Sequence, residues 1–161
     1  MTPATRADAR RVLGAFLGED AHYRASAAAY GDGGSAALDR ALALFLAHPE
    51  LGFVWIAYVE LPGGAREAAG ACVVCHAIST SRGSLVAKLD DVHVDERWQR
   101  RGVGGAMLDQ LFAALRAAGA TRVDTSCHRD NRDAWAFYAR RGFRALDEER
   151  IARLLDHAAH G

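Results

Sequence analysis

Residues 89–115 constrain the fold more than any other part of this 161-residue chain. The stretch begins with an apolar run that ends in Val94, and glycines stand at positions 102, 104 and 105. Apolar side chains then recur at the spacing of one helix face, at Val103, Met107, Leu111, Leu115 and Ala118. The pattern predicts a strand that runs through a glycine-bearing turn into an amphipathic helix.

The glycines give the predicted turn a chemical meaning. The first backbone N–H groups of a helix have no partner within the helix and lie at the positive end of its dipole. Glycines carry no Cβ atom that would keep a ligand's oxygens away from these groups, and Arg100 and Arg101 add positive charge beside them. Such a turn suits a phosphate or pyrophosphate. A flexible loop before an ordinary helix has the same glycine spacing, so the glycines alone leave both interpretations open.

Two common phosphate motifs do not fit this turn. Met107 stands where the dinucleotide fingerprint requires a third glycine, and the chain contains no G-x-x-x-x-G-K-[ST] run. The turn instead reads Gln99-x-x-Gly102-x-Gly104-Gly105, which resembles the acyl-CoA pyrophosphate loop (Q/R-x-x-G-x-G/A) of the GNAT N-acetyltransferase superfamily. Residues 131–143 read N-R-D-A-W-A-F-Y-A-R-R-G-F and meet every fixed position of that family's second pattern, N-x-x-A-x-x-F-Y-x-x-x-G-F. Both motifs occur in the expected order.

The resemblance extends over about residues 2–156 and implies a fold class. We expect one α+β domain over residues 1–161, with a mixed, mostly antiparallel sheet flanked by helices. The sheet would splay open where the fourth strand, residues 84–94, diverges from the fifth, residues 122–128. Acyl-CoA would lie in that cleft.

Hydrophobic periodicity and turn residues predict most of the other elements. We expect helices over residues 7–17, 36–47 (with Ser35 as N-cap) and 132–141. We expect an antiparallel meander of strands over residues 53–60, 67–79 and 84–94, and a short strand over 122–127. For the tail, the resemblance implies a final strand, although the apolar residues there have helical spacing.

Carried over residue by residue, the resemblance implies a cofactor site. Val92, His93 and Val94 would meet the pantetheine arm through backbone groups. The pyrophosphate would be held by Arg100, Arg101, Gly102, Val103, Gly104 and Gly105. Asn131 and Ala134 would flank the cofactor, and Tyr138 would protonate the leaving thiolate as general acid. Tyr138 also fits the role of a core aromatic in a short helix.

Two adjacent carboxylates mark the strand before the turn. Residues 89–94, L-D-D-V-H-V, resemble the L-E-D-x-x-V strand of diamine and polyamine acetyltransferases, in which the glutamate assists amine deprotonation. Asp90 takes that position as the predicted base, with a side chain one methylene shorter, and Asp91 is predicted to bind substrate. A strand-end carboxylate paired with Arg97 or Arg101 is the structural alternative. In a regular strand, neighbouring side chains face opposite sides, so only one of the pair would enter the site.

The segment between the first two helices commonly selects the substrate in this family. Here it contains Glu19, Asp20 and Tyr23, whose charge and ring suit a cationic amine. The resulting prediction is an acetyl-CoA-dependent N-acetyltransferase that acts on a primary amine by direct attack in a ternary complex. A polyamine, an amino sugar and a protein lysine or N-terminus remain open as acceptors. A non-catalytic acyl-CoA-binding domain is the rival interpretation.

The composition of the chain argues against several other kinds of partner and cofactor. Twenty basic and twenty acidic residues balance, so we expect no nucleic-acid or membrane partner, and with no secretory signal we expect a cytoplasmic protein. Cys72 and Cys75 spell C-x-x-C-H within an apolar strand, where residues three apart face opposite sides. We therefore expect no haem and no metal. Dimers are frequent in the family, and this alone suggests a homodimer.

Overall fold

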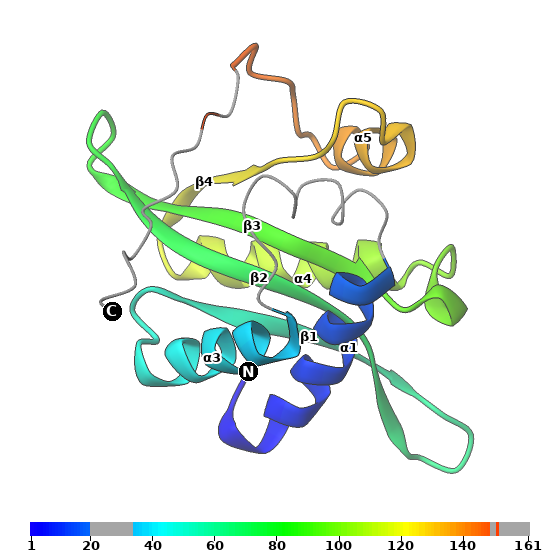
Figure 1. The fold of residues 1–161 in the computed structure, drawn as a ribbon. Helices are drawn as coiled ribbons and strands as arrows, with labels where there is room; N and C mark the ends of the chain where they lie inside the picture. The colour runs from blue at the N-terminus through cyan, green and yellow to red at the C-terminus, as the bar shows by residue number, and fades with distance from the viewer. Residues whose placement is uncertain (20–33, 149–150, 152–161) are drawn as a thin grey trace, which may run out of the picture.

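The computed structural model describes residues 1–19, 34–148 and 151 (Figure 1). Its helical elements are η1 (Pro3–Thr5), α1 (Arg6–Glu19), α3 (Gly34–Ala47), η2 (Glu96–Trp98), α4 (Val103–Ala117) and α5 (Arg132–Ala139). Its strands are β1 (Gly52–Glu60), β2 (Arg66–Ser79), β3 (Ser84–Val94) and β4 (Ala120–Thr125).

The four strands form one sheet in the order β1-β2-β3-β4. β1 pairs with β2 and β2 with β3 in antiparallel fashion, whereas β3 and β4 run parallel. The parallel pair needs a crossover, and α4 supplies it. The mixed, mostly antiparallel sheet and the predicted meander are therefore confirmed.

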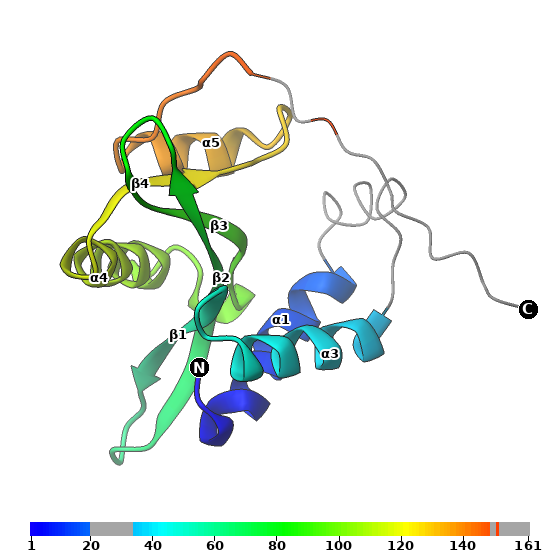
Figure 2. The same ribbon diagram turned by 90° about the vertical axis from the view of Figure 1, so that its left-hand side faces the viewer.

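Helices cover both faces of the sheet, with α1 and α3 on one side and α4 on the other (Figure 2). Alternate residues of β2 pack into different cores: Ala71 and Val73 contact the α1/α3 side, and Cys72 and Val74 contact the α4/α5 side. Because both faces are covered, the strand is apolar without alternation. Cys72 and Cys75 belong to opposite sides, as the sequence predicts.

The parallel pair separates halfway along β3. The last paired residues are Leu89 and Thr125, and β3 continues to Val94 without a partner on that edge among the described residues. The divergence that the resemblance implies is therefore present, and it exposes the end of β3 where the predicted site residues lie.

Several element ends differ from the sequence prediction. The second long helix begins at Gly34, so Ser35 is a helical residue and the N-cap prediction is wrong. β4 begins at Ala120, directly after Gly119, whose φ of 86° lets the chain reverse at once. α5 ends at Ala139 because Gly142, with φ 83°, closes the helix. The final strand predicted for the tail falls outside the described residues, apart from residue 151.

Candidate active site

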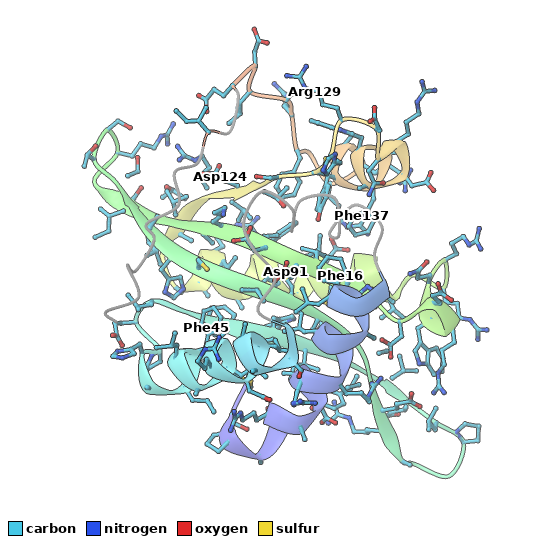
Figure 3. The ribbon with its side chains drawn as sticks, viewed as in Figure 1. Phe16, Phe45, Asp91, Asp124, Arg129 and Phe137 are labelled. Carbon is cyan, nitrogen blue, oxygen red and sulfur yellow. The ribbon has the colours of Figure 1, made fainter. Side chains whose placement is uncertain are left out.

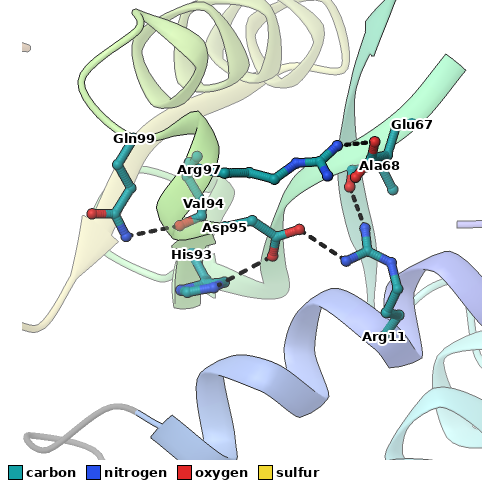
Figure 4. Close-up of polar contacts among 8 residues, drawn as sticks. All are labelled: Arg11, Glu67, Ala68, His93, Val94, Asp95, Arg97 and Gln99. Atoms are coloured by element: carbon teal, nitrogen blue, oxygen red, sulfur yellow. Dashed lines mark hydrogen bonds and ion pairs between the residues drawn. The ribbon is translucent and has the colours of Figure 1, made fainter. Parts of the chain in front are cut away.

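The turn between β3 and α4 is braced from within. The amide of Gln99 donates a hydrogen bond from Nε2 to the carbonyl oxygen of Val94, with an N···O distance of 2.9 Å (Figure 4). The backbone N–H of Gln99 also bonds to Asp95 and Glu96. The first position of the family motif thus holds the turn in shape, a role that the sequence comparison does not reveal.

The N-terminus of α4 has no side-chain cap. Its N-cap is Gly102, in the left-handed region with φ 83°, and the first helical hydrogen bond runs from Ala106 N–H to the Gly102 carbonyl. α5 shows the usual arrangement, in which Asn131 Oδ1 accepts a hydrogen bond from Ala134 N–H at 3.0 Å. The amides of the first turn of α4 are therefore left for another acceptor, which fits a phosphate group. Asn131, predicted to flank the cofactor, caps a helix.

Two arginines beside this turn have no acidic partner among the described residues. Arg100 and Arg101 make no ion pair within the part of the chain that the structure describes. The guanidinium of Arg101 lies 5.4 Å from the ring centroid of Trp98, and that of Arg97 lies 4.9 Å from it. Arg97 also pairs with Glu67. Trp98 therefore holds one neutralised and one unpaired cation next to the turn.

Arg141 is a cation that the sequence prediction missed. It lies between α4 and α5, where a Cβ atom at Gly105 would collide with its guanidinium. The group stacks on Phe137 at 4.3 Å and approaches Asp109 at 3.7 Å, and its buried Nε has no hydrogen-bond partner. A positive charge at a helix N-terminus is unfavourable unless an anion is near. A glycine in the first turn of α4 together with an arginine just after α5 was the signal available in the sequence.

A charge network holds the end of β3 against α1 (Figure 4). Arg11 donates from Nη1 to Asp95 Oδ2 at 2.8 Å and from Nη2 to the carbonyl of Ala68. Asp95 also lies 3.7 Å from Nε2 of His93, whose ring packs against Phe16. His93 and Asp95 line a hollow of about 340 Å³. The network fixes the strand end that the resemblance assigns to the pantetheine arm, and the predicted backbone contacts of Val92, His93 and Val94 stay predictions.

Tyr138 is buried on α5, facing the sheet. Burial raises the pKa of Tyr138 to about 12, and a hydrogen bond with Thr125 offsets part of that shift. Electrostatic interactions with Cys72, Cys127 and Asp90 raise the pKa of Tyr138 further. The phenol is therefore protonated at neutral pH, and residues from β2, β3, β4 and α5 meet around it.

An open groove continues from Tyr138 along the outer edge of β4. It has a volume of about 1160 Å³, and its walls include Thr125, Cys127, Trp135 and Phe143. Tyr138 therefore borders space large enough for a small molecule.

Asp90 and Asp91 differ in their surroundings. Asp90 Oδ2 accepts a hydrogen bond from Lys88 Nζ at 2.9 Å. Asp91 has φ 47° and sits where the pairing of β2 and β3 shifts register (Figure 3). Burial, and then the charge of Asp90, raise the pKa of Asp91 to about 6, while Lys88 lowers it. The register of the β2–β3 pairing therefore shifts next to Asp90 and at Asp91.

The remaining predicted residues fall at the edge of the described structure. Glu19 is the last residue of α1, and Asp20 and Tyr23 lie outside the described residues. Within residues 1–19, 34–148 and 151, no group of three metal-binding side chains occurs and all three cysteines are free. No helix in this part of the chain is long and apolar enough to cross a membrane.

Known proteins with the same fold were compared with the chain. An integron cassette protein from the mobile metagenome of Cole Harbour Salt Marsh is 21% identical, with a TM-score of 0.73 over 98% of this chain and 90% of that one. An aminoglycoside acetyltransferase, HMB0005, from an uncultured soil metagenomic sample is 18% identical (TM-score 0.66, 98% and 95% covered). Glucosamine-6-phosphate N-acetyltransferase from Arabidopsis thaliana is 16% identical (TM-score 0.63, 94% of each chain covered). These TM-scores show that the chain shares the fold of the three proteins.

The sequence match is more specific than the structural likeness. The model of the acetyltransferase (GNAT) family matches residues 21–143, which include the divergent strands, the turn before α4 and Tyr138. Members of this family use acetyl-CoA as a cosubstrate. The chain belongs to the acetyltransferase (GNAT) family and is an N-acetyltransferase.

Proposed function

We propose that this enzyme transfers the acetyl group of acetyl-CoA to the primary amine of a small cationic molecule, by direct attack in a ternary complex. The observation that carries the proposal is the meeting of three features at the end of β3. These are the uncapped N-terminus of α4, the carboxylate pair on β3 and the protonated phenol of Tyr138.

The phosphate end of acetyl-CoA would bind at the turn before α4. The N–H groups of Val103, Gly104 and Gly105 would donate to the pyrophosphate, and Arg100 and Arg101 would supply full charges. The bracing of the turn by Gln99 supports this proposal, because a shaped turn presents its amides without a further ordering cost.

Tyr138 would act as the general acid that protonates the leaving thiolate. When the amine nitrogen attacks the thioester carbonyl, the C–S bond breaks and the sulfur takes the phenolic proton. A thiolate in the same poorly solvated cleft has a raised pKa. The transfer therefore does not need an acidic phenol, and a hydroxyl that stays protonated suffices.

We propose a cationic acceptor because the charged side chains at the site carry a net negative charge. Asp90, Asp91 and Lys88 together carry one net negative charge at the point of strand divergence when both carboxylates are ionised. A positively charged amine is attracted to this pair. The predicted contributions of Glu19, Asp20 and Tyr23 remain part of the proposal. A polyamine and an amino sugar satisfy the same chemistry, and a lysine side chain or N-terminus of a protein is the alternative acceptor.

Release of the CoA thiol tests the proposal. Acetyl-CoA is incubated with the protein and spermidine, kanamycin, glycine or a lysine-containing peptide, and thiol is recorded with a chromogenic reagent. Controls lack protein or amine, because three free cysteines react with the reagent. Amine-dependent release with spermidine or kanamycin supports a small cationic acceptor. Release with the peptide alone makes the enzyme a protein acetyltransferase, and binding of acetyl-CoA without release from any amine points to a non-catalytic binding domain.

Three further expectations belong to this proposal. We propose that residues 1–161 form a single catalytic domain, that the enzyme works in the cytoplasm, and that it forms a homodimer. The cytoplasmic location is expected from the lack of a recognisable secretory signal, and the homodimer from the frequency of dimers in the family. Fractionation of cells and light scattering of the purified protein test them directly.

A further inference from the structure

We propose that Asp91 takes the proton from the acceptor amine, and that Asp90 serves to hold Lys88 and attract the cation. The inference rests on the proposed acetyl transfer and names the base within it. It shifts the base by one residue from the position that resemblance assigns.

The first argument is the backbone at Asp91. Ala71 pairs with His93 and Val73 with Asp90, so Asp91 and Val92 together stand opposite the single residue Cys72. This is a β-bulge, in which one strand carries an extra residue. Asp91 has φ 47°, a conformation rare for residues other than glycine. Strained backbone conformations persist only where the surrounding structure holds them in place, and they cluster at functional sites.

The second argument is the contrast in partners. Asp90 is bonded to Lys88 at 2.9 Å, and a carboxylate that accepts from an ammonium is stabilised in its ionised form. Asp91 makes no hydrogen bond or ion pair within the described part of the chain, although it is mostly buried. A desolvated carboxylate without such a partner holds a proton more readily than a carboxylate that is bonded to an ammonium group. Of the two groups, Asp91 is therefore the better proton acceptor.

The charged and titratable groups around Asp91 agree with this assignment. Asp90 and Lys88 act on it from its own strand, with opposite effects. From β2, Cys72 and Cys75 interact with it electrostatically, and the pKa of each thiol is raised, so both are neutral near pH 7. Burial, and then the charge of Asp90, raise the pKa of Asp91 to about 6 against the opposing effect of Lys88. A base with this pKa is ionised at neutral pH and still accepts a proton readily.

The proposed step balances as follows. An N–H bond of the ammonium breaks and an O–H bond forms on Asp91, which leaves a neutral amine. The nitrogen lone pair forms the C–N bond, the C–S bond breaks, and the thiolate takes the proton of Tyr138. The amide nitrogen loses its remaining extra proton, which restores the phenol, and Asp91 releases its own proton to solvent. One acetyl group moves, and one proton is released in total.

Matched asparagine variants test the assignment. Asp91→Asn removes the base and keeps the backbone conformation, since asparagine tolerates positive φ as well as aspartate does. We expect kcat/KM for the best acceptor among spermidine, kanamycin, glycine and a lysine peptide to fall by roughly 100-fold or more. Asp90→Asn should cause a smaller loss, mainly through a higher KM. Asp147→Asn is the control, because Asp147 also has φ 47° but is exposed and lies outside the site.

Three readouts separate a base from a structural residue. The pH profile of the wild-type kcat/KM should rise with an apparent pKa near the value of about 6 given for Asp91, and this limb should be absent from Asp91→Asn. The loss in Asp91→Asn should shrink for a fluorinated analogue of the acceptor, because its less basic amine is already neutral. Carbon NMR of the carboxyl group should show the same pKa in the protein alone.

The inference fails if Asp91→Asn retains near-wild-type kcat/KM, or if Asp90→Asn loses more. It also fails if the NMR titration of Asp91 has the ordinary midpoint of a carboxylate. These results leave acetyl transfer by the wild type intact. The absence of amine-dependent thiol release from the wild type itself overturns the proposed function, and the assignment of the base falls with it.

Discussion

The side-chain amide of Gln99 is bonded to the carbonyl oxygen of Val94 across the turn that joins β3 to α4. The bond ties the last residue of the proposed pantetheine strand to the first position of the proposed phosphate turn. The bond therefore connects the two halves of the proposed cosubstrate site.

Gln99→Ala should weaken acetyl-CoA binding because the turn loses this brace. A neutral hydrogen bond contributes about 0.5–1.5 kcal/mol, so we expect an affinity loss of about 2- to 12-fold. Titration calorimetry with acetyl-CoA measures the change. Gln110→Ala, on an exposed position of α4, is the control and should bind like the wild type. Equal affinity in both variants would show that the turn needs no brace.

Trp98→Leu should also weaken acetyl-CoA binding, since the guanidinium of Arg101 loses the ring that positions it. A cation–π contact at an exposed site contributes about 0.5–1 kcal/mol, which corresponds to about a two- to fivefold loss of affinity. Trp98→Phe keeps an aromatic face and should recover most of the affinity. If leucine and phenylalanine behave alike, the ring does not position Arg101.

Tyr138→Phe should lower kcat by roughly 100-fold or more and leave the affinity for acetyl-CoA unchanged, because only the proton donor is removed. Steady-state kinetics and calorimetry give the two quantities separately. Tyr58→Phe is the matched control: it removes a phenol that donates to Asp8 at 2.7 Å, on the α1 side of the sheet. It should lower stability and not kcat. Full turnover of Tyr138→Phe removes Tyr138 from the acid role.

Asp91→Asn should change the pH dependence of stability. The folded-state pKa of Asp91 is raised to about 6 from its ordinary value of 3.8, so the folded protein binds the proton more tightly than the unfolded chain. The stability linked to this group is present below its unfolded pKa and is lost as pH rises through the folded pKa. Relative to Asp91→Asn, the wild type should lose up to roughly 3 kcal/mol between about pH 4 and about pH 7.

Urea unfolding of both proteins across this range measures the difference. A parallel pH dependence of wild type and variant would mean that Asp91 has an ordinary pKa in the folded protein. At neutral pH, Asp91→Asn should therefore be more stable than the wild type but less active. This is the usual relation at a strained functional residue.

The sequence predicted the architecture well because its signals are local. The order of strands and helices follows from hydrophobic periodicity in β1, β2, β3 and α4, and the turn before α4 follows from Gly102 and Gln99. The opposite orientation of Cys72 and Cys75 follows from strand geometry alone. Each of these features depends on residues close together in the chain.

The features that the sequence did not reveal depend on contacts between distant segments. The bulge at Asp91 breaks the strand alternation that would let only one of Asp90 and Asp91 enter the site, and its register is set by β2. Arg141 can take its position because Gly105, thirty-six positions earlier in the chain, has no Cβ atom that would collide with its guanidinium.

The most direct test of the central claim is the stoichiometry of a single reaction. Wild-type protein, acetyl-CoA and spermidine are mixed, and mass spectrometry of the amine is recorded together with the CoA released. The account predicts one N-acetylated amine for each CoA thiol, and neither product without protein. CoA release in the absence of an acetylated amine, with spermidine or with kanamycin, glycine and the lysine peptide in its place, would contradict acetyl transfer to an amine.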